Sequence, residues 1–178
     1  MGKGILVCGC NGCGKSTLGP VLARRLGVRF LDIEDYYFPK ADPDFPYRGM
    51  RSRQAVTALL AADAAREEPF VLASCTGNYG PEVEPRFALA VLLTAPAEER
   101  DRRVRGRSFG LFGARMLPGG DLYDQEEAFF RMAAEKSPEK VRTRAHALGC
   151  PVLELASDRP PEALAEEIIR RINGLWEG

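Results

Sequence analysis

The sequence feature that most constrains the fold is a glycine-rich segment that lies between an apolar run and a helix-like segment. Residues 9–16 read Gly-Cys-Asn-Gly-Cys-Gly-Lys-Ser and match the spacing GxxxxGKS, directly after the apolar residues 5–8. Glycines let the backbone curl so that successive N–H groups point at an anion, next to the positive end of the following helix. The pattern therefore predicts a buried strand, a phosphate-binding loop and a helix, in that order.

We expect this loop to bind the triphosphate of ATP together with Mg²⁺. Lys15 is expected to act as a catalytic residue on the β- and γ-phosphates, and Ser16 to bind the metal through its hydroxyl. The residues expected to contact the nucleotide are Gly9, Cys10, Asn11, Gly12, Cys13, Gly14, Lys15, Ser16 and Thr17. The alternative is a chance glycine-rich turn, which the flanking strand and helix patterns disfavour.

Strand-like and helix-like patterns alternate along the rest of the chain, which predicts an α/β fold with a mainly parallel sheet. The expected strands cover residues 5–8, 28–31, 70–74, 87–93 and 151–155. The expected helices cover residues 15–26, 52–66, 97–105, 124–136, 138–148 and 162–172. Neither a repeat nor a linker interrupts this pattern, so we expect residues 1–178 to form a single domain.

Two segments have the composition of irregular structure. Residues 39–49 contain three prolines and a glycine, and we expect residues of about 34–66 to form the side of the site that receives the acceptor. Residues 106–120 hold five glycines among scattered arginines, which is typical of a mobile flap. A lid is therefore expected over residues of about 106–123.

The charge balance and hydropathy exclude several classes of protein. The chain has 25 Lys and Arg against 25 Asp and Glu, so no global field attracts nucleic acid. The sequence also shows no signal peptide and no apolar stretch long enough to cross a bilayer. We therefore expect a cytoplasmic monomer or homodimer that binds neither nucleic acid nor membrane.

The five cysteines indicate free thiols, because an odd number does not form a complete disulfide framework. A zinc site at Cys8, Cys10 and Cys13 is disfavoured, since a second CxxC pair is absent and His146 is distant in sequence. Cys10 and Cys13 lie beside backbone N–H groups and a lysine, which lower thiol pKa values. One hypothesis is that their oxidation blocks ATP binding; the alternative is that both are inert.

Three carboxylates follow the second expected strand, at the edge of the sheet where ligands bind in open α/β folds. We expect at least one of Asp32, Glu34 and Asp35 to hold magnesium-bound water or to accept a proton from an acceptor hydroxyl. The alternative is that they cap the next helical turn. The sequence leaves open which of the three acts.

Arginines and small polar residues provide the other candidates. The residues expected to bind the acceptor are Asp35, Arg48, Arg51, Thr76 and Asn78. Of the arginines in and around the lid, Arg103, Arg107 and Arg115 are expected to contact the triphosphate, where they would stabilise charge on the transferring group. The alternative for each arginine is a solvated surface role.

The order of these parts resembles that of the small P-loop kinases, which include shikimate kinase, gluconate kinase and the nucleoside monophosphate kinases. The similarity covers essentially the whole chain. It rests on residues 9–16, on Leu-Asp-Ile-Glu at 31–34 as a variant of the DxD motif, and on Arg-Val-Arg-Gly-Arg at 103–107. Residues 155–162 resemble the loop on the adenine side.

The resemblance implies a three-layer P-loop NTPase fold with a five-stranded parallel sheet of order 2-3-1-4-5, flanked by helices and carrying a lid. It also implies transfer of the γ-phosphoryl group of ATP to a small-molecule acceptor. By this resemblance Arg103 lies against adenine, Arg107 or Arg115 meets the phosphates, Asp32 is a metal ligand and Glu34 faces the acceptor. Glu34 replaces the second aspartate, and the sequence SCTGNYG at 74–80 disfavours shikimate.

Two other functions carry the same loop: a P-loop ATPase or GTPase switch, and a nucleotide-binding regulatory protein without an acceptor. The guanine motif NKxD and a strand ending in Asp-Glu are both missing from the sequence. An intact Lys15–Ser16 pair and the arginine-rich lid favour a kinase. The acceptor, a nucleoside, a nucleotide or a hydroxylated metabolite, stays open.

Overall fold

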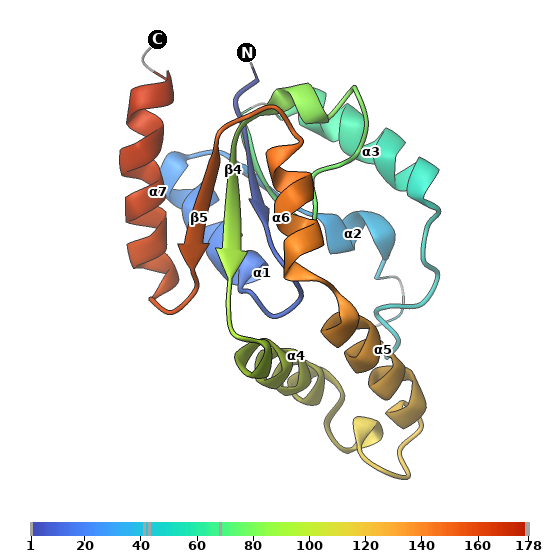
Figure 1. Cartoon of the computed structure of the whole chain (residues 1–178). Coiled ribbons are helices and arrows are strands. Elements are labelled where there is room, and N and C mark those ends of the chain that lie inside the picture. The colour runs from blue at the N-terminus through green and yellow to red at the C-terminus, as the bar shows by residue number, and fades with distance from the viewer. Residues whose placement is uncertain (1, 41, 43, 68, 177–178) are drawn as a thin grey trace.

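Five strands form one parallel sheet in the order β2-β3-β1-β4-β5, as the resemblance implied. The structure is a computed structural model that describes residues 2–40, 42, 44–67 and 69–176 (Figure 1). The strands are β1 (Gly4–Cys8), β2 (Arg29–Asp32), β3 (Phe70–Ala73), β4 (Phe87–Thr94) and β5 (Val152–Ala156). Strands β1 and β3 are buried along their whole length, as expected for apolar runs covered on both faces of a parallel sheet.

Helices cover both faces of the sheet, which confirms the three-layer fold. On one face α1 and α7 pack side by side, and α6 lies on the opposite face over β4 (Figure 1). The helices are α1 (Lys15–Leu26), α2 (Ile33–Tyr37), α3 (Arg53–Arg66), α4 (Ala97–Phe112), α5 (Tyr123–Glu135), α6 (Pro138–His146) and α7 (Pro161–Trp176), with 3₁₀ turns η1 (Glu84–Arg86) and η2 (Gly113–Met116). No helix in the described ranges is both long and apolar enough to span a bilayer.

Local sequence explains where several helices begin and end. The Ser52 hydroxyl accepts a hydrogen bond from the Ala55 N–H (3.2 Å) and starts α3. Ser137 caps α6 in the same way, ahead of a proline at the first helical position. Gly27 ends α1 with φ of +68°, a conformation that glycine adopts without strain.

The expectation of irregular structure from residue 106 was wrong for its first part, because α4 continues to Phe112. Val104, Ser108 and Phe112 recur every fourth residue and are all buried, which gives the helix a packed face. Gly106 and Gly110 lie where an added Cβ meets nothing within 4 Å. The buried face therefore outweighs the low helix propensity of the two glycines.

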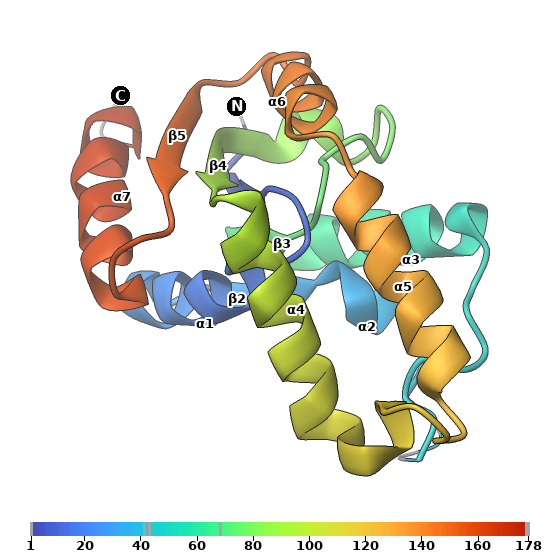
Figure 2. The same ribbon diagram turned by 60° about the horizontal axis from the view of Figure 1, so that its bottom comes forward.

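The segment α4–η2–α5 forms an arm that extends beyond the carboxyl ends of the strands (Figure 2). Its apolar interior is separate from the main core and contains Val104, Phe112, Met116, Leu122 and Phe130, against which Phe45, Tyr47 and Phe129 pack. Because Phe45 and Tyr47 come from the irregular segment before α3, that segment is attached to the arm.

Replacing Gly106 or Gly110 with alanine is expected to stabilise the protein by about 0.5–1 kcal/mol each, because glycine in a helix interior loses more backbone entropy on folding than alanine does. Thermal unfolding followed by circular dichroism should show a rise in Tm of about 2 °C per substitution. Gly19→Ala in α1 is the matched control, since its Cβ would lie 2.3 Å from the Phe30 ring and should lower Tm. A fall in Tm for both α4 variants would contradict the helical assignment of residues 106–112.

Candidate active site

A cavity with a volume of about 1030 Å³ opens at the carboxyl ends of the strands. The phosphate loop and the start of α1 form one wall, and α2 with the segment before α3 forms the second. The loop after β3, together with α4, α5 and α6, completes the lining. The cavity therefore brings together segments from nearly the whole length of the chain.

The phosphate loop packs so tightly that glycine is required at two of its positions. Gly9 and Gly12 have φ of +145° and +80°. A Cβ on Gly9 would lie 2.5 Å from the Leu93 carbonyl oxygen, and one on Gly12 would lie 2.4 Å from the Arg100 carbonyl oxygen. The loop thus rests directly on the backbone at the end of β4 and in the first turns of α4.

The Lys15 ammonium lies over the loop that the sequence predicts to bind phosphate. Its Nζ donates to the Cys10 carbonyl oxygen at 2.9 Å, and Lys15, Ser16 and Thr17 all line the cavity. Asn11, Gly12 and Gly14 line it as well, whereas Gly9, Cys10 and Cys13 lie behind them, outside the cavity lining. The loop therefore presents N–H groups, a hydroxyl and an ammonium to one space, as an anion site requires.

Arg103 joins the phosphate loop to the loop that follows β5. Its guanidinium donates to the Ser157 hydroxyl (2.9 Å) and carbonyl (3.0 Å), and more weakly to the Gly12 carbonyl oxygen at 3.3 Å. Arg103 lines the cavity between these two loops. This location is beside the segment that the sequence analysis assigned to the adenine side.

The environment of Cys10 and Cys13 is opposite to the one that the oxidation hypothesis assumed. Both thiols are buried, and burial raises the pKa of each above the ordinary thiol value. Positive charges of Lys15 and Arg100 lower these pKa values but do not outweigh the loss of solvation. The premise of activated thiols was therefore wrong, and Cys10 and Cys13 act as small packing residues in the main core.

The three carboxylates after β2 have three different environments. Asp32 caps α2 by accepting a hydrogen bond from the Glu34 N–H at 3.0 Å. Glu34 forms an ion pair with Arg107 across the cavity, with Oε1 and Nη1 3.5 Å apart. Asp35 is exposed, pairs with Lys40 and does not line the cavity.

Ser16 and Asp32 are the candidate metal ligands, and both line the same cavity. A hydroxyl and a carboxylate supply the oxygen ligands that Mg²⁺ prefers, and an open cavity leaves room for the waters that Mg²⁺ retains. The donor set therefore fits magnesium.

On the acceptor side the structure separates the arginines that the sequence grouped. Arg48 stacks over the Phe45 ring at 3.9 Å, and Arg51 donates to the Tyr36 carbonyl oxygen at 2.8 Å. Neither of them lines the cavity, whereas Arg53 does. Arg53 was not among the residues that the sequence predicted to bind the acceptor.

The loop after β3 presents Thr76 to the cavity and keeps Asn78 behind it. The Thr76 hydroxyl donates to the Asn78 side-chain oxygen at 2.6 Å, and Arg53 donates to the Asn78 carbonyl oxygen at 2.6 Å. A buried hydrogen bond of 2.6 Å between the hydroxyls of Ser74 and Tyr79 holds the loop. Asn78 thus orients Thr76 and Arg53 in this structure.

Arg115 lies apart from the phosphate loop. It pairs with Asp121 at 2.8 Å, donates to the Asp44 carbonyl oxygen at 3.1 Å and lies 5.0 Å above the Phe45 ring. Of the three arginines expected to meet the triphosphate, only Arg103 and Arg107 line the cavity. Arg115 instead connects the arm to the segment before α3.

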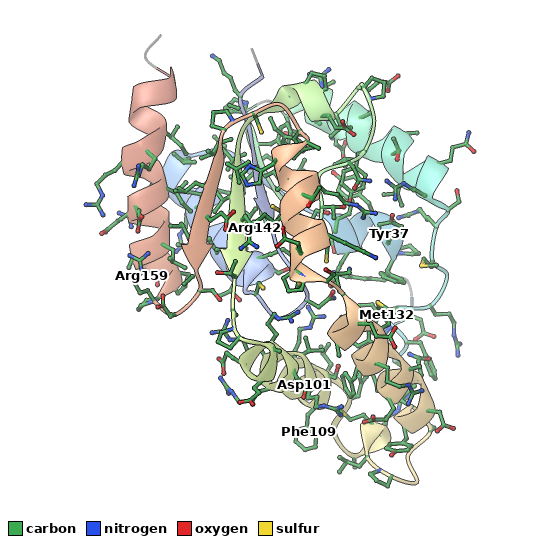
Figure 3. All side chains as sticks on the ribbon, in the orientation of Figure 1. Tyr37, Asp101, Phe109, Met132, Arg142 and Arg159 are labelled. Atoms are coloured by element: carbon green, nitrogen blue, oxygen red, sulfur yellow. The ribbon has the colours of Figure 1, made fainter. Side chains whose placement is uncertain are left out.

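Sequence reasoning missed the contribution of α5, α6 and the aromatic residues. Figure 3 shows Tyr37 on α2 above Met132 on α5, and both line the cavity. The unassigned residues of the lining include Tyr37, Phe38, Tyr47, Tyr79, Glu126, Phe129, Met132, Lys136, Lys140 and Arg144. The helical spacing of positions 126, 129 and 132 was the available signal, because it places three residues on one side of α5.

Comparisons with known proteins agree with this architecture. A family model described as AAA domain matches residues 5–109, more than half of the chain. The uncharacterized protein YqaC of Bacillus subtilis (strain 168) is 33% identical over 166 residues, which cover 89% of this chain and 90% of that protein.

Solved structures of kinases have the same fold. Shikimate kinase from Acinetobacter baumannii in complex with shikimate superposes with a TM-score of 0.62 at 21% identity, covering 98% of this chain and 94% of that chain. A gluconokinase from Sinorhizobium meliloti 1021 gives 0.58 at 16% identity, with coverage of 98% and 93%. Deoxyadenosine kinase from M. mycoides gives 0.58 at 14% identity, with coverage of 96% and 99%.

The family model and YqaC match this chain in sequence, whereas the three kinases match it in fold. The identities to the three kinases are low, so these similarities show the fold alone, whereas the family model and YqaC show descent. The chain therefore belongs to the AAA domain family, with YqaC as a relative, and it has the fold seen in shikimate kinase and gluconokinase.

Proposed function

We propose that this protein transfers the γ-phosphoryl group of ATP to a hydroxyl group of a small-molecule acceptor, which is a nucleoside, a nucleotide or a hydroxylated metabolite. The observation that carries the proposal is that Lys15 of the phosphate loop and the Glu34–Arg107 pair line one cavity of about 1030 Å³. A cavity of this size is at the upper end for a single drug-sized ligand, which suits a site for two ligands. The names of the kinases with the same fold support the proposal.

The nucleotide side of the cavity consists of the phosphate loop and Arg103. Backbone N–H groups of the loop and the Lys15 ammonium bind the β- and γ-phosphates, and Arg103 contacts the nucleotide from α4. Ser16 and Asp32 are the residues that would hold Mg²⁺, which when bound neutralises charge on the phosphates. These groups position the triphosphate with its γ-phosphate toward α2.

Glu34 and Arg107 act on the acceptor side. In the proposed reaction the oxygen of the acceptor hydroxyl attacks the γ-phosphorus, and the bond between the γ-phosphorus and the β-phosphate oxygen breaks. Glu34 accepts the proton that the acceptor hydroxyl loses. Arg107 stabilises the charge of the transferring group. Both partners of the Glu34–Arg107 pair are about one-third or more exposed, so exchanging the pair for ligand contacts costs little.

Turnover that depends on an acceptor is the direct test of the proposal. ADP formation by the purified protein should rise on addition of at least one compound from a panel of nucleosides, nucleotides, sugar acids and other hydroxylated metabolites. Lys15→Ala should lower this rate by about 100-fold or more, because it removes a preorganised positive charge from the transferring phosphate. Lys3→Ala is the matched control, since Lys3 is exposed outside the cavity.

Two outcomes would contradict the kinase assignment. One is ATP hydrolysis at the same rate with every compound in the panel and without any. The other is a Lys15→Ala variant, folded by circular dichroism, that keeps the wild-type rate.

The roles of the neighbouring carboxylates can be separated by isosteric substitution. Glu34→Gln is expected to lower kcat by about 100-fold or more, because an amide cannot take the acceptor proton. Asp35→Asn should stay close to wild type, since Asp35 is exposed and pairs with Lys40 outside the cavity. Steady-state kinetics on both variants measure kcat. An equal fall in kcat for the two variants, or a larger fall for Asp35→Asn, would contradict the proposed role of Glu34.

A further inference from the structure

Glu126 is a buried carboxylate that the proposed reaction does not use. It lies on the buried face of α5 with Phe130 and Ala133, only 3% of its surface is exposed, and it lines the cavity. Within the described ranges its carboxylate has neither a hydrogen-bond donor nor an ion-pair partner. Its oxygens are not among the fully buried atoms that lack a partner in the described residues, so they remain open to the cavity, and a ligand that displaces water there must supply a hydrogen-bond donor.

The walls around Glu126 are aromatic. Tyr47 and Phe129 line the cavity next to the apolar interior of the arm, and Tyr37 and Phe38 line it on the side of α2. Burial raises the pKa of the Tyr47 hydroxyl, and nearby charges of Arg107, Glu34 and Glu126 act on the same group. Tyr47 and Glu126 therefore share one neighbourhood, in which aromatic faces suit a flat ring system.

The remaining charges of the cavity indicate what kind of donor Glu126 receives. The chain as a whole is neutral, but seven cationic side chains line the cavity against the four carboxylates of Asp32, Glu34, Glu126 and Glu135, and three of these cations are Lys136, Lys140 and Arg144. No ion pair of these three side chains is seen in the part of the chain that the structure describes. A ligand with a free ammonium group would be repelled by these cations, whereas a neutral amino group on a ring would donate to Glu126 without added charge.

We propose that Glu126 recognises the exocyclic amino group of a nucleobase, so that the phosphoryl acceptor is a nucleoside or nucleotide with an amino-bearing base such as cytosine or adenine. The inference rests on the proposed function, because it names the acceptor of that same site. A carboxylate accepts hydrogen bonds from an amino group of this kind and repels the carbonyl oxygen that uracil or hypoxanthine has in its place. The aromatic walls stack on the base.

Direct binding tests the inference without requiring turnover. Titration calorimetry in the presence of a non-hydrolysable ATP analogue and Mg²⁺ compares cytidine with uridine and adenosine with inosine, each also as the 5′-monophosphate. In at least one pair the wild-type protein should bind the amino-bearing compound about tenfold or more tightly than its oxo counterpart.

Substitution of Glu126 provides the second comparison. Glu126→Gln should reduce the discrimination to about twofold or less, because an amide both donates and accepts and so pairs with either base. Glu127→Gln is the matched control: Glu127 is the next residue on α5, pairs with Arg105 and does not line the cavity, so the wild-type preference should persist.

The results that overturn the inference differ from those that overturn the kinase assignment. The proposed role of Glu126 is contradicted if the wild-type protein binds both members of every pair equally or binds none of them. It is also contradicted if the Glu126→Gln variant retains the preference of the wild-type protein. It also falls if a sugar acid or another compound without a base is the better acceptor, which would leave the kinase assignment intact. Base-dependent binding without any phosphorylated product would instead preserve the role of Glu126 and contradict the kinase assignment.

Discussion

The close packing of the phosphate loop on the backbone that follows β4 is the constraint on which the rest of the site depends. Gly9 and Gly12 approach the carbonyl oxygens of Leu93 and Arg100 so closely that a Cβ at either position would overlap them. This contact exists because the sheet order places β1 directly beside β4. As a result the start of α4 borders the phosphate loop, and Arg103, less than one turn further along α4 from Arg100, reaches both Gly12 and Ser157.

The second constraint is the arm, which determines how the acceptor side is enclosed. Its apolar interior includes Phe45 and Tyr47 from the segment before α3. Arg115 adds a hydrogen bond to the Asp44 carbonyl oxygen and a cation–π contact to Phe45. The segment before α3 and the arm are therefore connected in this structure, and a movement of the arm would carry the wall that contains Tyr47 with it. In this arrangement Arg115 links the two segments rather than facing the phosphate loop.

The sequence predicted the fold well because strand and helix signals in this chain are strong and local. The five strands, the sheet order and six helices followed from apolar runs, caps and the resemblance to P-loop kinases. The short helix α2 was missed, since five residues give little periodicity, and the extension of α4 was missed because Gly106 and Gly110 suggest a loop. The Asp32 cap stabilises α2, and the buried face of α4 stabilises its extension. The local composition indicates neither contribution.

Residues of the site were predictable where a motif fixes the backbone and less predictable where side chains meet across the fold. Lys15, Ser16 and Asp32 line the cavity as the spacing of their motifs indicated. Arg48, Arg51 and Arg115 are instead held by partners that are not part of the cavity lining. The residues on α5 and α6 were missed because neither helix carries a motif, and only the fold brings them to the phosphate loop.

The central claim is that the cavity transfers a phosphoryl group to an acceptor and does not merely cleave ATP with water. The most direct measurement follows the γ-phosphoryl group itself, with ATP labelled by ¹⁸O on its non-bridging γ-oxygens and products identified by mass spectrometry. The account predicts that the labelled oxygens appear in a phosphorylated acceptor in proportion to the ADP formed. Recovery of all label in inorganic phosphate, with every acceptor tested, would contradict it.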